Sequence, residues 1–511
     1  MPAPFSPLLI GADTPPPEEQ GYRPTINPLV IPATQTPSLA EGWQGNFNAL
    51  SQWYRDQQQK SYDLGLADPE TGWPTPKGTR EAATAAATNL VMGSVAPKGV
   101  ADRISTRVPT AVGQTIDPHS TADLRVGLDS SRASGEAYAK NADIINGYSD
   151  VPTQRLRNAD SISEKLVNHV QENLTHLHDA MPPEIRARAM QWYDGANTIA
   201  HDWAQKYGLS PRATAGTLAS LSPQKDWFQN VDLARRVIET RASQGNTRMT
   251  PEMDPHLQRY VDMQKVPVDR ERLQATVDDF RRGKPLGDIT DPREQAMWIR
   301  AFDEAHNPRS YPIITPEGGT SGTAVTGTGA PQRIGWGSFN EIAKANSVLN
   351  NDSLPNISSA MGGNHKVRNF YNNIIAPNAP HGDVTIDTHA IAAGHMRPLA
   401  GSDPEVSAGL GLTGSSSAQT GSRGLYGLYA EGYRRAAAQA GILPRQMQSV
   451  TWEGVRGLFS PEQKRNVKFV ADMKELWSQY GKGTTDARTT RERVSQAAGG
   501  INPPEWWRPG P

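Results

Sequence analysis

The sequence predicts a mainly α-helical protein with an extended, proline-rich N-terminal arm and long Gly/Ser-rich loops. The clearest helical signal is an apolar stripe whose members recur at spacings of four and three: Ile185, Ala189, Trp192, Ala196, Ile199 and Trp203. Such spacing places every member on one face of a single helix. Pro183 near its start and Gly208 at its end are typical of helix boundaries. We therefore expect one long amphipathic helix here.

Further helices follow from the same kind of periodicity. Shorter helices are expected at 212–221 and 226–242, and longer ones at 425–441 and 445–480. A helix is also predicted at 40–62, where Trp43, Phe47, Leu50 and Tyr54 recur on one face.

Two kinds of segment interrupt the helical pattern. Residues 1–40 contain ten prolines, which fix φ and lack an amide donor, so an extended arm is expected. It is either a disordered tail or an arm that orders against a partner in an assembly. Residues 243–335 resemble an insertion whose first part is charged and helical and whose second part is a flexible Gly-rich loop. A second Gly/Ser-rich loop spans 401–424.

The chain is expected to divide into five parts. These are an arm at 1–40, a helical segment at 41–110, a polar linker at 111–160, a helical domain at 161–480 that contains the insertion, and an irregular tail at 481–511.

Composition excludes several classes of protein. Cysteine is absent, so disulfides and iron–sulfur clusters are excluded. The first residues lack the basic and apolar regions of a secretory signal. The sequence contains no run of about 18 apolar residues, so no membrane span is expected. The net charge is −1, so any binding to nucleic acid requires a local basic patch. His169 and His176 lie one heptad apart, and no histidine spacing resembles a known ligand set, so no metal site is expected.

Four short motifs follow one another in a suggestive order. They are Leu221-Ser222-Pro223-Gln224, Phe339-Asn340-Glu341-Ile342-Ala343-Lys344-Ala345, Gly362-Gly363-Asn364-His365-Lys366 and Val384-Thr385-Ile386-Asp387-Thr388-His389. Lys366 begins a helix, and Asp387 follows a β-like approach, so the two side chains could face each other across one cleft. An amine can attack the C1′ atom of a nucleoside, and a carboxylate can stabilise the cationic sugar that forms.

Together these motifs resemble the helix-hairpin-helix DNA glycosylase superfamily, of which endonuclease III is a member. The resemblance covers about residues 185–400, apart from the insertion. It implies that Asp387 stabilises the oxocarbenium-like sugar and that Lys366 forms a Schiff base with C1′. It also implies that Gln224 fills the gap left by a flipped base. Such chemistry needs no metal or other cofactor.

The resemblance also implies contacts to DNA from the hairpin. Gly362 and Gly363 match hairpin glycines whose amides approach a phosphate, and Asn364 and His365 complete the same turn. The hairpin lacks the second regular glycine of the family, and the insertion is unusually long for it. His389 is interpreted as a local cap or structural residue.

Each singled-out side chain also has a purely structural interpretation. Asp387 could cap a helix, Lys366 could be a solvated helical lysine, and Gln224 could cap or pair locally. Trp227, Phe370 and Tyr371 are expected in the core. Asp387 and Lys366 remain the candidate catalytic residues.

The C-terminal helices carry a basic footprint. Residues 431–493 contain twelve Lys/Arg and seven Asp/Glu, and we expect Arg434 and Arg435 to contact DNA phosphates. The basic residues of this expected surface are Arg434, Arg435, Arg445, Arg456, Lys464, Arg465 and Lys468. An ordinary solvated helical surface is the alternative.

The N-terminal third suggests a biological setting. The run Asp68-Pro69-Glu70-Thr71-Gly72-Trp73-Pro74, followed by an alanine-rich helix, resembles a segment of tailed-phage structural and virion-associated proteins. We therefore expect a virion-associated protein, located in the virion or host cytoplasm. Its partners would be DNA and, through the arm, other phage virion proteins. The alternative is a purely structural virion protein whose glycosylase-like fold is inactive.

Overall fold

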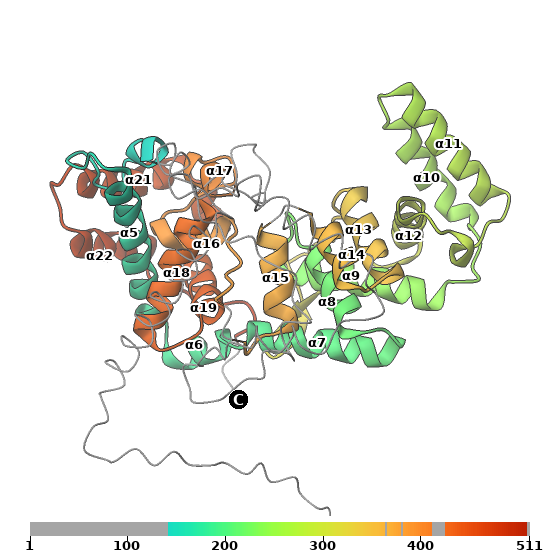
Figure 1. The fold of residues 1–511 in the computed structure, drawn as a ribbon, viewed down its shortest axis with the longest axis horizontal. Coiled ribbons are helices and arrows are strands. Elements are labelled where there is room, and N and C mark those ends of the chain that lie inside the picture. The colour runs from blue at the N-terminus through green and yellow to red at the C-terminus, as the bar shows by residue number, and fades with distance from the viewer. Residues whose placement is uncertain (1–141, 363–364, 380–381, 411–424, 508–511) are drawn as a thin grey trace, which may run out of the picture. The chain divides into compact units, whose positions relative to one another are not determined.

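The computed structural model describes residues 142–362, 365–379, 382–410 and 425–507 (Figure 1). All of them belong to one compact unit, residues 54–511. This part of the chain forms eighteen α-helices and one two-stranded sheet, which confirms the mainly α-helical class. The arm at 1–40, the segment at 41–110 and the helix expected at 40–62 lie outside the described residues.

The helices gather around two hydrophobic cores. The first core is formed mainly by α6 (Pro183–Ala189), α7 (Trp192–Tyr207), α8 (Pro211–Ser220), α9 (Trp227–Ser243), α10 (Asp254–Asp262), α11 (Pro267–Arg281), α12 (Pro292–His306), α13 (Phe339–Asn350), α14 (Leu354–Met361) and α15 (His365–Ile375). The second is formed mainly by α5 (Ala159–Ala180), α16 (Thr388–His395), α17 (Pro404–Leu410), α18 (Tyr426–Ala440), α19 (Pro444–Leu458), α21 (Val467–Gly481) and α22 (Ala487–Ala498). Helix α19 contributes to both, with Val450 in the first core and Met447 in the second.

The single helix expected over the first apolar stripe is instead two helices, α6 and α7. The chain turns tightly at Met190 and Gln191, where the Gln191 amide donates to the Arg188 carbonyl at 2.9 Å. Neither residue is a proline or glycine, so this break has no sequence signal. The apolar positions on both sides of it remain buried, except Trp203, which is only partly buried. Gly208 ends α7 in the left-handed conformation, as predicted.

Helices α8, α9 and α18 form where the sequence predicts them, and the starts of α8 and α9 carry capping residues. The Ser210 hydroxyl accepts from the Ala213 amide at 3.1 Å, and Asp226 Oδ1 accepts from the Gln229 amide at 2.9 Å. These side chains satisfy amides that have no partner in the first helical turn.

In the C-terminal part, one expected helix is divided into shorter helices, and the tail contains a helix that was not expected. The helix predicted at 445–480 is three helices, α19, α20 (Pro461–Arg465) and α21. Ser460 caps α20 and Asn466 caps α21, and these capping residues mark the breaks. The tail at 481–511, expected to be irregular, contains helix α22, which Asp486 caps through a 2.9 Å hydrogen bond from the Thr489 amide.

Residues 142–160, which belong to the polar linker expected at 111–160, contain buried side chains. Ile145 and Val151 are fully buried in the second core, and Asp150 is buried with them. The buried apolar side chains recur at intervals of three residues: Ala142, Ile145, Tyr148 and Val151.

The insertion belongs to the first core. Trp298 on α12 and Phe280 on α11 are almost completely buried, although the far ends of α10 and α11 project from the rest (Figure 1). Two 3₁₀ helices, η2 (Pro251–Met253) and η3 (Leu286–Asp288), connect its α-helices. Its second part, expected to be a flexible loop, forms a short antiparallel hairpin of β1 (Pro312–Ile314) and β2 (Thr320–Thr323).

A close backbone contact holds this hairpin against α7. A Cβ atom at Gly195 would collide with the Pro316 carbonyl, so the contact requires a glycine in the helix.

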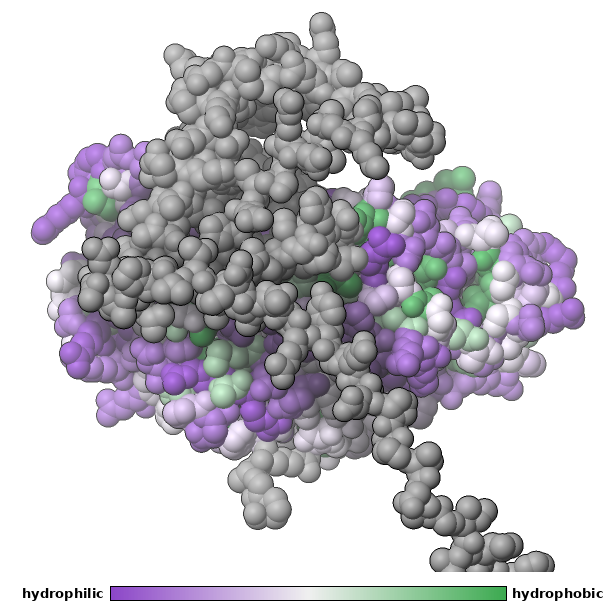
Figure 2. Space-filling model, turned by 60° about the horizontal axis from the view of Figure 1, so that its bottom comes forward, coloured by the Kyte–Doolittle hydropathy of each residue, from purple (hydrophilic) through white to green (hydrophobic). Residues whose placement is uncertain are grey.

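The described residues on one face of the molecule are mostly polar at the surface (Figure 2). Figure 2 shows a face on which hydrophilic residues predominate and apolar patches are small and separated. Among the described residues, none of the helices is long and apolar enough to cross a membrane.

Candidate functional site

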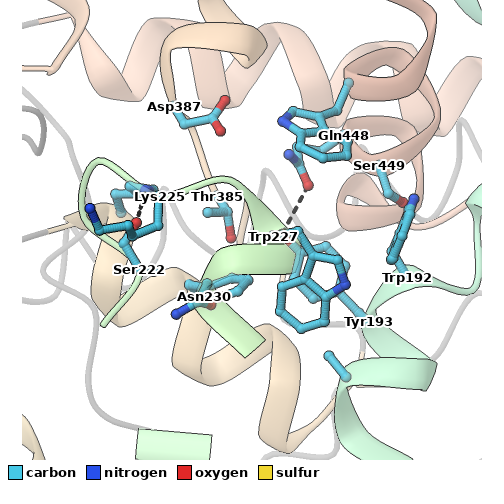
Figure 3. Close-up of a pocket in the computed structure, with 14 residues that line it drawn as sticks. Trp192, Tyr193, Ser222, Lys225, Trp227, Asn230, Thr385, Asp387, Gln448 and Ser449 are labelled. Atoms are coloured by element: carbon cyan, nitrogen blue, oxygen red, sulfur yellow. Dashed lines mark hydrogen bonds between the residues drawn. The ribbon is translucent and has the colours of Figure 1, made fainter. Parts of the chain in front are cut away.

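A pocket lies where the two cores meet. It is lined by Trp192, Tyr193, Ala196, Ser222, Lys225, Trp227, Asn230, Lys366, Phe370, Thr385, Asp387, Gln448, Ser449 and Trp452. Figure 3 shows Asp387, Ser222 and Lys225 on the side opposite Trp192 and Tyr193. The pocket thus combines an aromatic wall with an amine and a carboxylate.

Lys366 is the second residue of α15 and is only 8% exposed. Its Nζ atom donates a 3.0 Å hydrogen bond to the carbonyl of Ser222. Burial lowers the pKa of the Lys366 ammonium, and the negative charges of Asp387 and Glu341 oppose this shift. Lys366 is therefore not the solvated helical lysine of the structural interpretation.

Asp387 is both the N-cap of α16 and a residue of the pocket. Its Oδ1 atom accepts from the Ala390 amide at 2.8 Å, as the capping interpretation predicts. The extended residues before it are held by the Tyr426 hydroxyl, which donates to Val384 O at 2.7 Å. Asn369 on α15 donates to the same carbonyl at 3.0 Å, so the segment that carries Asp387 is attached to the helix that carries Lys366.

The structure brings Lys366 and Asp387 together. The two residues line the same pocket, and the charge of Asp387 acts on the Lys366 ammonium. This geometry depends on how α15 and α16 are joined, because each residue lies at the beginning of its helix.

Three polar atoms that line the pocket are buried without a hydrogen-bond partner in the described part of the chain. They are Ser222 Oγ, Trp227 Nε1 and Asn230 Oδ1. The other side-chain atom of Asn230, Nδ2, donates to Leu218 O at 2.9 Å, which orients Oδ1 as a free acceptor. Leaving such groups unsatisfied costs about 1–3 kcal/mol each, so each of them is suited to bind water or a polar ligand.

Sequence reasoning missed much of the pocket wall. Gln448 and Trp452 lie one helical turn apart on α19, and Gln448 Oε1 accepts from the Tyr193 hydroxyl at 2.9 Å (Figure 3). Tyr371 is in the core as expected, whereas Trp227 and Phe370 are partly buried and line the pocket. Only the four-residue spacing of Gln448 and Trp452 could have indicated their shared face.

Gln224 lies in the turn between α8 and α9, beside the pocket residue Lys225. It is exposed, and its φ of 57° is in the left-handed region. An L-residue pays a steric cost in that conformation, and such strain occurs more often at functional sites than elsewhere.

The hairpin residues are placed less favourably for DNA contact. Gly362 caps the end of α14, and its carbonyl accepts from Arg368 Nε at 2.6 Å. Gly363 and Asn364 lie outside the described residues. His365 is 2% exposed and stacks on Tyr426 with ring centroids 5.1 Å apart, so its imidazole is a core group.

The expected basic surface is largely neutralised. Arg435 pairs with Glu164 and Glu431, and Arg434 donates to the Gly382 carbonyl at 3.0 Å. Arg445 is not on the surface, because it is 2% exposed, and burial lowers the pKa of its guanidinium to about 10.

A group with metal-ligand chemistry lies in the second core. Asp150, His169 and His395 bring their ligand atoms within 4.8 Å of one another. Asp150 Oδ2 already bonds His395 Nδ1 at 2.7 Å and accepts from Arg397 at 3.2 Å. Because a cation would compete with both of these contacts, the arrangement fits an internal charge network better than a metal site.

The fold and the pocket define a helical protein of two packed cores with an amine and a carboxylate at their boundary. Residues 156–253 and 324–458 match the model of a family described as a family of unknown function, DUF7178. The match includes Lys366, Asp387 and α19 and leaves out residues 254–323, which form most of the insertion. No curated protein matches the chain, and no solved structure matches it.

Proposed function

We propose that this protein is a DNA glycosylase with AP lyase chemistry, and that the pocket receives a base flipped from duplex DNA. The observation that carries the proposal is the placement of Lys366 and Asp387 in one aromatic-walled pocket. The order of the sequence motifs supports the same activity. The three unpartnered polar atoms of the pocket are suited to the polar edge of a base, and aromatic walls are suited to its faces.

The chemistry requires a neutral amine at Lys366. Its Nζ atom forms a bond to C1′ while the bond from C1′ to the base nitrogen breaks, and that electron pair leaves with the base. The base takes up a proton and the amine gives one up, so charge and protons balance. Burial favours the neutral amine, because it lowers the pKa of Lys366.

Asp387 acts on the sugar. As positive charge develops at C1′ and the ring oxygen, a nearby carboxylate stabilises the transition state more than the ground state. Because Asp387 caps α16, its Oδ1 atom accepts from the Ala390 amide, and the other carboxylate oxygen is left for the sugar. Gln224, exposed at the turn beside the pocket, would occupy the space in the duplex that the flipped nucleotide vacates.

Borohydride trapping tests this function. The full chain is incubated with duplexes carrying abasic, uracil, oxidised or alkylated sites, and the covalent complex is quantified beside Lys366→Met and Asp387→Asn. We expect an adduct that Lys366→Met abolishes and Asp387→Asn strongly reduces. Equal adduct in Lys366→Met would remove the assigned nucleophile, and no adduct or alkali-labile product on any duplex would overturn the proposal.

A structural virion protein with an inactive fold is the second candidate. The neutralised arginines favour it, because Arg434 and Arg435 engage protein groups instead of presenting free charge. Asp387→Asn separates the two candidates: a scaffold would assemble unchanged and show no activity to lose, whereas an enzyme would lose turnover.

A further inference from the structure

A group of basic side chains lies beside the pocket on α19, α20 and α16. Arg456 places its guanidinium carbon 4.3 Å from the ring centroid of Trp452, which lines the pocket. His389 meets the same indole edge-on, with centroids 5.9 Å apart. Lys464 lies close enough to Arg456, His389 and Asp387 for their charges to interact. Three basic residues therefore adjoin one wall of the pocket.

Two of these groups have no protein partner among the described residues. Lys464 is partly buried and makes no ion pair or hydrogen bond there, although burial and the charge of Arg456 lower its pKa to about 8. The Nδ1 atom of His389 is buried without a partner. The basic residues that follow Lys464 in the sequence are paired. Arg465 forms an ion pair with Glu462 at 3.0 Å, and Lys468 forms one with Asp472 at 2.7 Å.

Nearby carboxylates only partly cancel this charge. Glu453 lies 3.7 Å from Arg456, but burial raises the pKa of Glu453 and its Oε1 accepts the indole N–H groups of Trp192 and Trp506. Asp387 is committed in part to capping α16, and Glu505 acts on the same region from the tail. Lys464 therefore keeps an ammonium that no protein carboxylate pairs directly in the described part of the chain.

We propose that Arg456, Lys464 and His389 form a phosphate subsite that holds the backbone of the strand whose base enters the pocket. Guanidinium and ammonium groups donate strong charge-assisted bonds to phosphodiester oxygens. Burial lowers the pKa of His389 well below its ordinary value, so its imidazole donates as a neutral N–H group. Trp452 separates the subsite from the pocket, so one nucleotide contacts both. This inference rests on the proposed function and identifies the part of the DNA that the protein uses to position it.

Equilibrium binding of the full chain tests the subsite. The probe is a duplex with one tetrahydrofuran abasic analogue, titrated over a salt series with wild type, Lys464→Met and Lys468→Met. We expect Lys464→Met to weaken binding about tenfold and to reduce the slope of log K against log salt by about 0.9, the value for one lost phosphate contact. Lys468→Met is the matched control, because it removes a lysine that is paired with Asp472.

Replacing single phosphates of the duplex by uncharged methylphosphonates then identifies the phosphate that Lys464 contacts. One methylphosphonate is placed in turn at each position that flanks the abasic site. The loss of binding caused by Lys464→Met should disappear at one of these positions only. Thermal unfolding confirms that the variant is folded. Equal binding and equal slopes for Lys464→Met and Lys468→Met would overturn the inference, as would absence of duplex binding by wild type.

The two proposals fail in different ways. If borohydride trapping fails while Lys464→Met still lowers binding at one phosphate, the subsite stands and the excision chemistry falls. If excision occurs and Lys464→Met binds like wild type, only the subsite falls.

Discussion

The Nζ atom of Lys366 donates a 3.0 Å hydrogen bond to the backbone carbonyl of Ser222, 144 residues earlier in the chain. This bond connects the start of α15 to the turn between α8 and α9, and that turn also carries Gln224. A buried amine with one neutral acceptor keeps a fixed position without an ion pair that would raise its pKa. The contact is therefore suited to an amine that must lose its proton to react.

Replacing Lys366 should make the protein more stable. The folded state disfavours the ammonium because burial lowers its pKa, so the cost is largest well below the folded pKa and disappears above the ordinary value of 10.5. We expect Lys366→Met to gain about 1 kcal/mol in urea unfolding near neutral pH, since active-site residues are commonly selected at the expense of stability. The gain should shrink as pH approaches about 10. A loss of stability would show that the Ser222 contact outweighs burial.

Asp387→Asn should separate capping from chemistry. Asparagine caps helices about as well as aspartate, so the change in unfolding free energy should stay within about 0.5 kcal/mol, whereas Asp387→Ala should cost about 1 kcal/mol. Excision should be lost in both. Asp486→Asn, at the N-cap of α22, is the control and should change neither stability nor excision. Full excision by Asp387→Asn would assign Asp387 to capping alone.

Gln224→Gly should raise stability while weakening DNA binding. Glycine adopts the observed φ of 57° without the steric cost, and the gain should be about 0.5–1 kcal/mol after the entropy of the unfolded chain is counted. Gln224→Ala keeps the strain and should show no gain. Both variants should bind an abasic duplex equally poorly. Unchanged binding in both would remove Gln224 from the DNA interface.

Arg236 should be essential for joining α9 to the insertion. It donates to Asp232 Oδ2 at 2.7 Å and to Asp303 Oδ1 at 2.6 Å, and all three side chains are buried. Arg236→Met removes the cation that bridges the buried carboxylates of Asp232 and Asp303 and should cost about 3–5 kcal/mol. Arg235→Met removes a half-exposed partner of Asp232 and Glu239 while Arg236 still neutralises Asp232, so it should cost less than about 1 kcal/mol. Similar thermal shifts for the two variants would contradict this account.

DNA binding should weaken as pH rises through about 8. The pKa of Lys464 is lowered to about 8, so in the free protein its positive charge is present below that pH and is lost above it. Lys464→Arg, which stays charged, should bind equally over the same range. A wild-type profile that matches Lys464→Arg would show that Lys464 does not contribute its charge to binding.

Local signals in the sequence predict most of the helices and fewer of their boundaries. Ser210, Asp226 and Gly208 mark helix ends by their own hydrogen bonds or backbone freedom, so those boundaries were predictable. The break at Met190 and Gln191 was not, because tertiary packing imposes it on residues that are compatible with a helix.

For the site, the sequence by itself indicated the two candidate residues, because Lys366 and Asp387 each lie at the start of a predicted helix within a short, recognisable motif. Tertiary structure alone decided that they line the same pocket and that Gln448 and Trp452 form its far wall. It also decided that Arg434 and Arg435 are engaged by protein groups while Lys464 is not. The reason is physical: capping and periodicity act over a few residues, whereas burial, charge pairing and pKa depend on segments far apart in the chain.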